Sequence, residues 1–346
     1  MRQSFEELLS QFFRDYENSC RSRVIARVWQ RGERGMAKAI FGVDLGGTTV
    51  KLGLFDMEGN ALDKWEIPTR KEENGKNILP DIAQSVKEKM SEKGYAGSDV
   101  AGIGIGVPGP VDSAGTIYKA ANLGWGVMNI NDELGALTGL TVKAGNDANV
   151  AALGEMWKGG GQGYRNMVAV TLGTGVGGGI IVDGQLLAGA TGAGGEIGHI
   201  HVNDEEEDAC GCGNHGCLEQ YASATGVVRL AKKALAESDR DSVLRSGELS
   251  AKSVFDAVKA GDALAMEIAE KFGGYLGKGL ASVACVVNPE IFVIGGGVSK
   301  AGPILLDYIE KYYKPCVFHG SRDAKFALAT LGNDAGIYGA ARLVLS

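Results

Sequence analysis

The densest group of chemically reactive side chains in this sequence lies between Glu196 and Glu219. Three cysteines fall within eight residues, and a histidine precedes the first of them by eleven positions: Cys210, Cys212, Cys217 and His199. Three thiolates and one imidazole complete a tetrahedral zinc shell and leave no open position for a catalytic water. The carboxylates of Glu196 and Glu219 flank this set. We therefore expect a metal that shapes a binding pocket and takes no part in the chemistry.

The histidine ligand of this cluster is not decided by spacing, because His201 and His215 are rival ligands. His201 would share a face with His199 if the segment were extended, since side chains two apart in a strand point the same way. The alternative for the whole cluster is a purely structural zinc knuckle that touches no ligand.

A second chemical group is the pair Asn146-Asp147, which stands at the start of a predicted helix over residues 148–158. An aspartate here is often only a helix N-cap. An aspartate that accepts a hydroxyl proton is also a recurring part of phosphoryl-transfer sites. The helix N-terminus would lower the pKa of Asp147 and keep it ionised to orient a hydroxyl.

Two glycine turns could bind phosphate. Gly46-Gly47-Thr48 and Gly173-Thr174-Gly175 each join two predicted strands. Glycine lets backbone N–H groups converge on an anion, and the threonine hydroxyl adds a donor. One such turn would more often be an ordinary hairpin. Two of them at equivalent places of a repeated pattern favour a phosphate clamp.

Other glycine-rich segments fit nucleotide motifs less well. Gly104–Gly109 and the run from Gly173 to Gly178 match the dinucleotide spacing, but neither leads into a helix, so we reject both as nicotinamide sites. No P-loop pattern occurs in the sequence. Gly295–Gly297 follows the strand-like residues 291–294. It is either a close-packed turn or a flat backbone surface beside an adenine ring.

The elements that must position these groups repeat along the chain. Residues 39–45, 50–55 and 61–67 read as three strands joined by turns, and the pattern returns in residues 167–172, 178–182 and 185–188. Apolar residues every four positions from Ile78 predict a helix that ends near Gly94. A long helix is predicted over residues 262–284. The expected class is α/β, with a duplicated domain and a cleft between its copies.

Composition limits the function classes. The chain has 346 residues, 22% charged, with a net charge of −7 and a pI of about 5.3, which argues against nucleic acid as the main partner. No apolar run approaches the ~20 residues that span a bilayer. Cys20, Cys285 and Cys316 are scattered and suggest no disulfide framework, which fits a reducing cytoplasm.

The first 35 residues differ from the rest, since they hold seven arginines and no lysine. Our hypothesis is that Met36 is the natural start and that this segment is translated upstream sequence. The alternative is a genuine amphipathic helix around Phe5–Tyr16. Five acidic residues argue against a transit peptide.

Taken together, these motifs resemble the ROK family (repressor, open reading frame, kinase) of the sugar kinase, actin and heat-shock ATPase superfamily, and most closely its bacterial glucokinases. The resemblance covers roughly residues 37–346. It implies a two-lobed actin/hexokinase-like (ribonuclease H-like) fold. It further implies an N-terminal extension over 1–36, an N-terminal lobe over 37–145, a C-terminal lobe over 146–330, and a helix over 331–346 that packs back on the first lobe.

The resemblance also implies roles for single residues. It assigns the ATP phosphates to Gly46, Gly47, Thr48, Lys51, Thr171, Thr174 and Gly175. It places Asp44 at the magnesium–water shell, Gly295–Gly297 (Gly295, Gly296 and Gly297) against adenosine, and Asp147 as the base for a sugar 6-hydroxyl. It assigns the sugar hydroxyls to Asn122, Asn146, Asp147, Glu196, His199 and Glu219. It favours His199 over His201 as the ligand that completes a structural zinc site with Cys210, Cys212 and Cys217.

These roles predict an ATP-dependent hexose 6-kinase that uses Mg²⁺ with ATP and a structural Zn²⁺, with glucose as the expected substrate. Fructose, mannose, N-acetylmannosamine and N-acetylglucosamine are the alternative sugars, and polyphosphate is an alternative donor. A sugar-sensing repressor of the same family is the alternative from another class; the 35 residues before the first strand are too few for its DNA-binding domain. Relatives suggest a homodimer or homotetramer.

Overall fold

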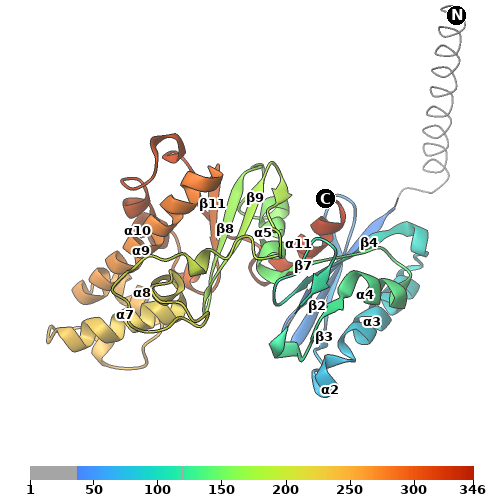
Figure 1. Ribbon diagram of the computed structural model, residues 1–346, viewed down its shortest axis with the longest axis horizontal. Coiled ribbons are helices and arrows are strands. Elements are labelled where there is room, and N and C mark those ends of the chain that lie inside the picture. Colours follow the sequence, from blue (N-terminus) through green and yellow to red (C-terminus); the bar gives the residue numbers. More distant parts are fainter. Residues whose placement is uncertain (1–36, 119) are drawn as a thin grey trace, which may run out of the picture.

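The computed structural model describes residues 37–118 and 120–346, and it has two lobes with a pair of helices between them (Figure 1). The hypothesis about Met36, the helix around Phe5–Tyr16 and Cys20 lie outside the described residues. In the described part, no helix combines the length and the apolar character needed to cross a membrane.

The first lobe is built on a five-stranded sheet, as far as the described residues go, in the order β3-β2-β1-β4-β7. Its strands are β1 (Ala39–Leu45), β2 (Thr49–Phe55), β3 (Ala61–Pro68), β4 (Val100–Val107) and β7 (Val142–Asn146). β1, β2 and β3 pair antiparallel, whereas β4 and β7 run parallel to β1. β1 is almost entirely buried, as expected for a central strand that is apolar on both faces.

The second lobe repeats this topology in the order β10-β9-β8-β11-β12. Its strands are β8 (Met167–Leu172), β9 (Val176–Val182), β10 (Gln185–Leu186), β11 (Ile291–Gly295) and β12 (Lys325–Leu328). β8, β9 and β10 pair antiparallel, and β11 and β12 run parallel to β8. The predicted duplication is therefore confirmed, because each strand of one sheet has a counterpart at the same place in the other.

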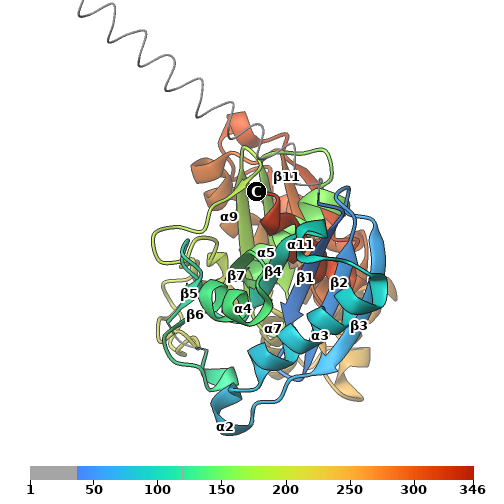
Figure 2. The ribbon, with the colours of Figure 1, turned by 90° about the vertical axis from the view of Figure 1, so that its right-hand side faces the viewer.

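Helices cover the outer side of each sheet. In the first lobe, α3 and α4 lie across the sheet (Figure 2); the helices there are α2 (Glu72–Gly75), α3 (Ile78–Lys93) and α4 (Ile130–Thr138). Gly94 ends α3 in the left-handed conformation at φ 68°, as its place after the apolar repeat predicts. The second lobe carries α6 (Glu219–Ala222), α7 (Ala224–Glu237), α8 (Ala251–Lys259), α9 (Ala263–Val287) and α10 (Ile304–Tyr313).

Two smaller features complete the description. The short strands β5 (Thr116–Ile117) and β6 (Met128–Asn129) form a two-stranded sheet of their own. Gly295–Gly297 is followed by a 3₁₀ turn over Val298–Ala301, and the next α-helix is α10.

The last helix of each repeat crosses between the lobes. α5 (Asp147–Lys158) follows β7 of the first sheet but packs against β8 and β9 of the second. α11 (Ala335–Val344) follows β12 of the second sheet but packs against β1 and β4 of the first. The two helices also pack on each other, and Gly154 and Gly339 allow their backbones to touch. The start of α5 therefore lies where the chain passes from one lobe to the other.

Candidate active site

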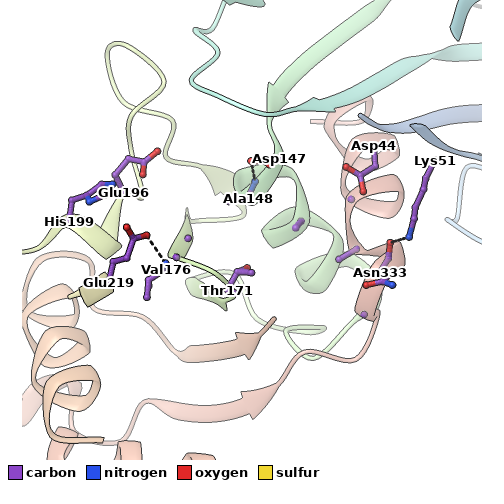
Figure 3. Close-up of a pocket in the computed structure, with 17 residues that line it drawn as sticks. Asp44, Lys51, Asp147, Ala148, Thr171, Val176, Glu196, His199, Glu219 and Asn333 are labelled. Atoms are coloured by element: carbon purple, nitrogen blue, oxygen red, sulfur yellow. Dashed lines mark hydrogen bonds between the residues drawn. The ribbon is translucent and has the colours of Figure 1, made fainter. Parts of the chain in front are cut away.

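A cavity of about 550 Å³ lies between the lobes and brings eight of the predicted site residues together (Figure 3). Those that line it are Asp44, Lys51, Asp147, Thr171, Gly175, Glu196, His199 and Glu219. In the view of Figure 3, Asp147 lies between two groups. Glu196, His199 and Glu219 form one group, and Asp44 and Lys51 form the other.

Asp147 reaches the cavity because its neighbour caps the helix. The Oδ1 atom of Asn146 accepts hydrogen bonds from the N–H groups of Ala148 at 3.0 Å and Asn149 at 3.2 Å. Asp147 is therefore the first helical residue, and the alternative that it is the N-cap is wrong. Asn146 also donates from Nδ2 to the carbonyl of Gly109 at 3.2 Å. Its amide is thus largely used in fixing the start of α5.

The pKa of Asp147 differs from the expectation. Burial raises the pKa of Asp147, and this outweighs the N–H of Ala148, which donates to its Oδ1 at 2.8 Å. The expected lowering by the helix N-terminus is therefore wrong in sign, because the cavity walls displace more water than the helix end replaces. Solvent still reaches the Asp147 carboxylate through the cavity mouth.

Asp44 lies across from Asp147, at the end of β1. Burial raises the pKa of Asp44 to about 6, the charge of Asp147 acts in the same direction, and Lys51 opposes both. A carboxylate whose pKa is raised by burial and by a second carboxylate marks a place where a cation is favourable.

Lys51 contacts the segment that passes from the second lobe back to the first. Its Nζ donates to the carbonyl of Asn333 at 3.1 Å, in the segment that joins β12 to α11. Gly332, Asn333, Ala335 and Gly336 from this segment also line the cavity. None of them was predicted from the sequence. The glycines around a helix start at residues 332–336 were the available signal, but they resemble those of many ordinary turns.

The metal-ligand cluster is built by a short antiparallel contact. Leu218 N donates to Ile200 O at 2.8 Å, and Val202 N donates to Gly216 O at 2.7 Å. This contact brings the residues around His199 against those around Cys217. A tight turn follows from Gly213 N to Cys210 O at 2.8 Å and from Cys210 N to Asn214 O at 2.7 Å. The turn places Cys210 and Cys212 beside His199 and Cys217.

The four predicted ligand atoms lie within 4.8 Å of one another: those of His199, Cys210, Cys212 and Cys217. Cys210 Sγ is 3.8 Å from His199 Nδ1, and the Sγ atoms of Cys212 and Cys217 are 3.7 Å apart. A tetrahedral zinc with Zn–S of about 2.3 Å sets its sulfur ligands about 3.8 Å apart. The spacing and the chemistry of this donor set therefore fit a closed zinc site.

The rival histidine His201 points elsewhere. Its Nδ1 lies 2.9 Å from the carbonyl of His215, and its Nε2 lies 2.8 Å from Asp204. His199 instead turns Nδ1 toward the cysteines, and its ring lines the cavity.

Glu219 joins the cluster to the second glycine turn. Its Oε2 accepts a hydrogen bond from Val176 N at 3.0 Å, and its Oε1 lies 3.7 Å from Cys210 Sγ. A Cβ atom on Gly175 would lie 2.0 Å from the same carboxylate, so a larger residue there would displace the Glu219 side chain. The segment that holds the ligand cysteines and the predicted phosphate turn are thus in direct contact.

The remaining predicted residues lie around this centre. Gly295–Gly297 line an adjoining cavity of about 530 Å³ that shares Thr171, Gly332 and Asn333 with the first. Thr174 faces a separate hollow beside Thr225, to which its carbonyl is hydrogen-bonded at 2.7 Å. The walls of the two adjoining cavities do not include Asn122, Asn146, Gly46, Gly47 or Thr48.

Comparison with known proteins agrees with this geometry. The ROK family model matches residues 40–346. The chain is 46% identical to a glucokinase of Halalkalibacterium halodurans, over 88% of this chain and 94% of that protein. It is 36% identical to a ROK family glucokinase from Streptomyces griseus, whose structure was solved in complex with glucose and AMPPNP, with a TM-score of 0.68 over 88% and 98% of the two chains.

A ROK hexokinase from Thermus thermophilus superposes with a TM-score of 0.74 at 33% identity, over 88% of this chain and 97% of that one. The match therefore extends through both lobes and includes the cavity and the ligand cluster. From this extent of similarity, the chain belongs to the ROK family.

Proposed function

We propose that this protein is an ATP-dependent glucokinase, which transfers the γ-phosphoryl group of ATP to the 6-hydroxyl of glucose. The observation that carries the proposal is the place of Asp147, in one cavity with Glu196, His199 and Glu219 and with the glycines of the second turn. The H. halodurans and S. griseus glucokinases, the latter with bound glucose and AMPPNP, support the substrate pair.

The sugar end of the cavity is proposed to be Glu196, His199 and Glu219. Asn122 and Asn146, which lie outside the cavity walls, are proposed as further sugar contacts. Carboxylates and an imidazole accept and donate hydrogen bonds in the pattern that sugar hydroxyls require. Asp147 would accept the proton of the 6-hydroxyl as that oxygen attacks the γ-phosphorus. Its raised pKa brings it nearer to working pH than an exposed aspartate, which makes it a better base.

The phosphate end is proposed to be Lys51, Thr171, Gly175 and the two glycine turns, including Gly46, Gly47, Thr48 and Thr174. Asp44 would orient the water shell of the Mg²⁺ that arrives with ATP. Such groups act by holding and neutralising the transferred phosphoryl group, because its transition state is loose. Gly295–Gly297 would face adenosine in the adjoining cavity.

A structural zinc ion is proposed for His199, Cys210, Cys212 and Cys217, on the spacing given above. When bound, the metal would fix the ring of His199 and leave its other nitrogen free for the sugar. The closed ligand set supplies no position for a reacting water.

The proposal also includes the bounds of the lobes, the oligomeric state and the cellular location, which rest on the resemblance to the ROK family. The lobes are taken as residues 37–145 and 146–330, with residues 331–346 belonging to the first lobe in space. A homodimer or homotetramer and a cytoplasmic location complete it. Sedimentation of the purified protein measures the oligomeric state.

The decisive experiment is a coupled assay with ATP and polyphosphate over a panel of hexoses, run on the wild type, Asp147→Asn and Asp183→Asn. Asp183 lies in the exposed turn between β9 and β10, so its variant is a matched control. We expect phosphorylation of glucose by ATP, a loss of roughly 10²–10⁴-fold in kcat for Asp147→Asn with glucose binding retained, and no change for Asp183→Asn. No phosphorylation of any hexose, or full turnover in Asp147→Asn, would refute the proposal.

A further inference from the structure

Glu155 is a buried carboxylate that the function proposed above does not use. Its side chain lies on α5, two turns after Asp147, and the residue is only 4% exposed. In the part of the chain that the structure describes, no lysine or arginine pairs with it. A carboxylate this buried is retained only where other groups satisfy it.

Backbone N–H groups satisfy it instead. Oε2 accepts hydrogen bonds from Gly160 N at 2.8 Å and Thr330 N at 3.1 Å, and Oε1 accepts one from Leu331 N at 3.0 Å. Hydrogen bonds to an ionised acceptor are stronger than neutral ones. The carboxylate therefore ties the end of α5 to the segment that leads from β12 into α11.

The glycines after α5 are shaped for this contact. A Cβ atom on Gly159 would lie 2.0 Å from Oε2 of Glu155, and one on Gly160 would lie 2.4 Å from the carbonyl of Leu328. The triplet Gly159–Gly161 therefore does more than end a helix. It lets the chain fold closely around the Glu155 carboxylate and against the end of β12.

The segment that Glu155 holds borders the nucleotide side of the site. Thr330 and Glu155 line the cavity of Gly295–Gly297, and Gly332 and Asn333 line both cavities. The carbonyl of Asn333 also accepts the hydrogen bond of Lys51 from β2. A shift of this segment would move the wall of the nucleotide cavity and the acceptor that orients Lys51.

We propose that Glu155 is a positioning residue for the nucleotide: it fixes residues 330–333 so that the cavity beside Gly295–Gly297 and the Lys51 contact keep the shape that binds ATP. This inference rests on the proposed function, because it takes that cavity as the adenosine site. It predicts an effect on ATP that is separate from any effect on the sugar.

The test is Glu155→Gln. Glutamine keeps the shape, but its NH₂ group would face a backbone N–H, so at least one of the three contacts is lost. We expect the KM for ATP to rise about tenfold, with the KM for glucose unchanged, because a lost hydrogen bond to a buried charged group is worth about that factor. Glu155→Asp keeps the charge on a shorter side chain, so its KM for ATP should lie between those of the wild type and Glu155→Gln.

Glu290→Gln is the matched control. Oε2 of Glu290 accepts hydrogen bonds from Arg165 N at 2.9 Å and Asn166 N at 2.8 Å, which is the same chemistry at the opposite end of β8 and β11. This variant should leave the KM for ATP unchanged, whatever it does to stability.

Direct titration of ATP by calorimetry separates the two proposals. If the wild type binds ATP but phosphorylates no hexose, the proposed function fails, and weaker ATP binding by Glu155→Gln still supports the role of Glu155. Equal rises of both KM values, or unchanged ATP affinity in Glu155→Gln, would overturn the inference. If Glu155→Gln does not fold, unchanged ATP affinity in Glu155→Asp overturns it equally.

Discussion

The Nδ1 atom of His199 lies 3.8 Å from the Sγ atom of Cys210, while the same imidazole forms part of the wall that faces Asp147. One ring thus belongs to the ligand cluster and to the candidate sugar pocket at once. If a metal fixes this ring, removal of the imidazole should reduce metal binding and sugar affinity together.

The first prediction follows for His199→Ala. We expect reduced zinc content and a glucose KM raised by about ten- to a hundredfold, the range seen when the groups that orient a metal site are removed. Metal analysis of the purified protein and glucose titration measure the two effects. Loss of zinc with normal glucose affinity, or the reverse, would contradict a shared role.

His201→Ala is the control for that experiment. His201 is exposed and contacts His215 O and Asp204, outside the cluster. An exposed pair of this kind contributes little to stability, because solvent screens it. The variant should keep both zinc and glucose affinity.

The strands, the glycine turns and the duplication could be predicted from sequence because their signals are local. Continuous apolar runs such as Ala39–Leu45 and glycines between them identify buried strands and tight turns without knowledge of the rest of the chain. Repetition of the same order at residues 167–188 then indicated two similar lobes, which the two sheets confirm.

The parts that escaped prediction depend on tertiary contacts. Asn146 and Asp147 are both good N-caps, and only the backbone shows that Asn146 has the extended conformation of the cap, with ψ of 143°. The raised pKa of Asp147 comes from burial in a cavity that residues of both lobes line. Glu155 and Asn333 carry no motif, because their partners are backbone groups or a lysine far away in sequence.

The second prediction concerns pH and Asp44. Its pKa of about 6 means that Asp44 gains a proton as the pH falls through 6, and a neutral carboxyl orients a magnesium–water shell poorly. The affinity for MgATP should therefore fall below pH 6. In Asp147→Asn the neighbouring negative charge is absent, so this fall should occur at lower pH.

The contribution of Asp44 to folding stability changes with pH in the opposite direction to the affinity for MgATP. Its folded pKa lies above the ordinary 3.8, so between about pH 4 and 6 the folded state holds more protons and Asp44 favours folding as the pH falls. Calorimetric titration of MgATP between about pH 5 and 8, beside thermal melting, distinguishes the two effects. If the affinity for MgATP fell at the same pH in the wild type and in Asp147→Asn, the coupling of Asp44 to Asp147 would be contradicted.

The third prediction concerns Glu206, which anchors the loop before the ligand cysteines. Its side chain is 7% exposed and bonds Arg229 at 2.5 and 2.6 Å, and Tyr221 also donates to it. The Arg229 guanidinium lowers the pKa of Glu206 to about 2 against the opposing effect of burial. We expect Glu206→Gln to cost about 1–3 kcal/mol at neutral pH, since Arg229 is partly exposed and keeps Asp208 as a partner.

The sign of its pH dependence follows from the lowered pKa. Glu206 contributes stability above its ordinary pKa of 4.5, and this is lost as the pH falls from there toward 2. Urea unfolding should therefore show a gap between wild type and Glu206→Gln at neutral pH that narrows in acid. The neighbouring exposed Glu207→Gln serves as control, and a gap that is independent of pH would argue against the Arg229 contact.

The last prediction concerns the crossing of α5 and α11, on which the position of Asp147 depends. A Cβ atom on Gly339 would lie 1.6 Å from the carbonyl of Val150 and 2.8 Å from Gly154 N, all backbone atoms of the other helix. Backbone cannot rotate away as a side chain does, so Gly339→Ala must push the helices apart, at a cost of about 3 kcal/mol or more. Gly274→Ala in α9, where the nearest atom is 3.9 Å away, should instead be neutral or stabilise the protein by up to about 1 kcal/mol. Thermal melting and kcat measurements on Gly339→Ala and Gly274→Ala test this prediction. Because α5 carries Asp147 at its first residue, separation of the helices should also lower kcat; a Gly339→Ala protein with wild-type stability would show that the lobes do not depend on this contact.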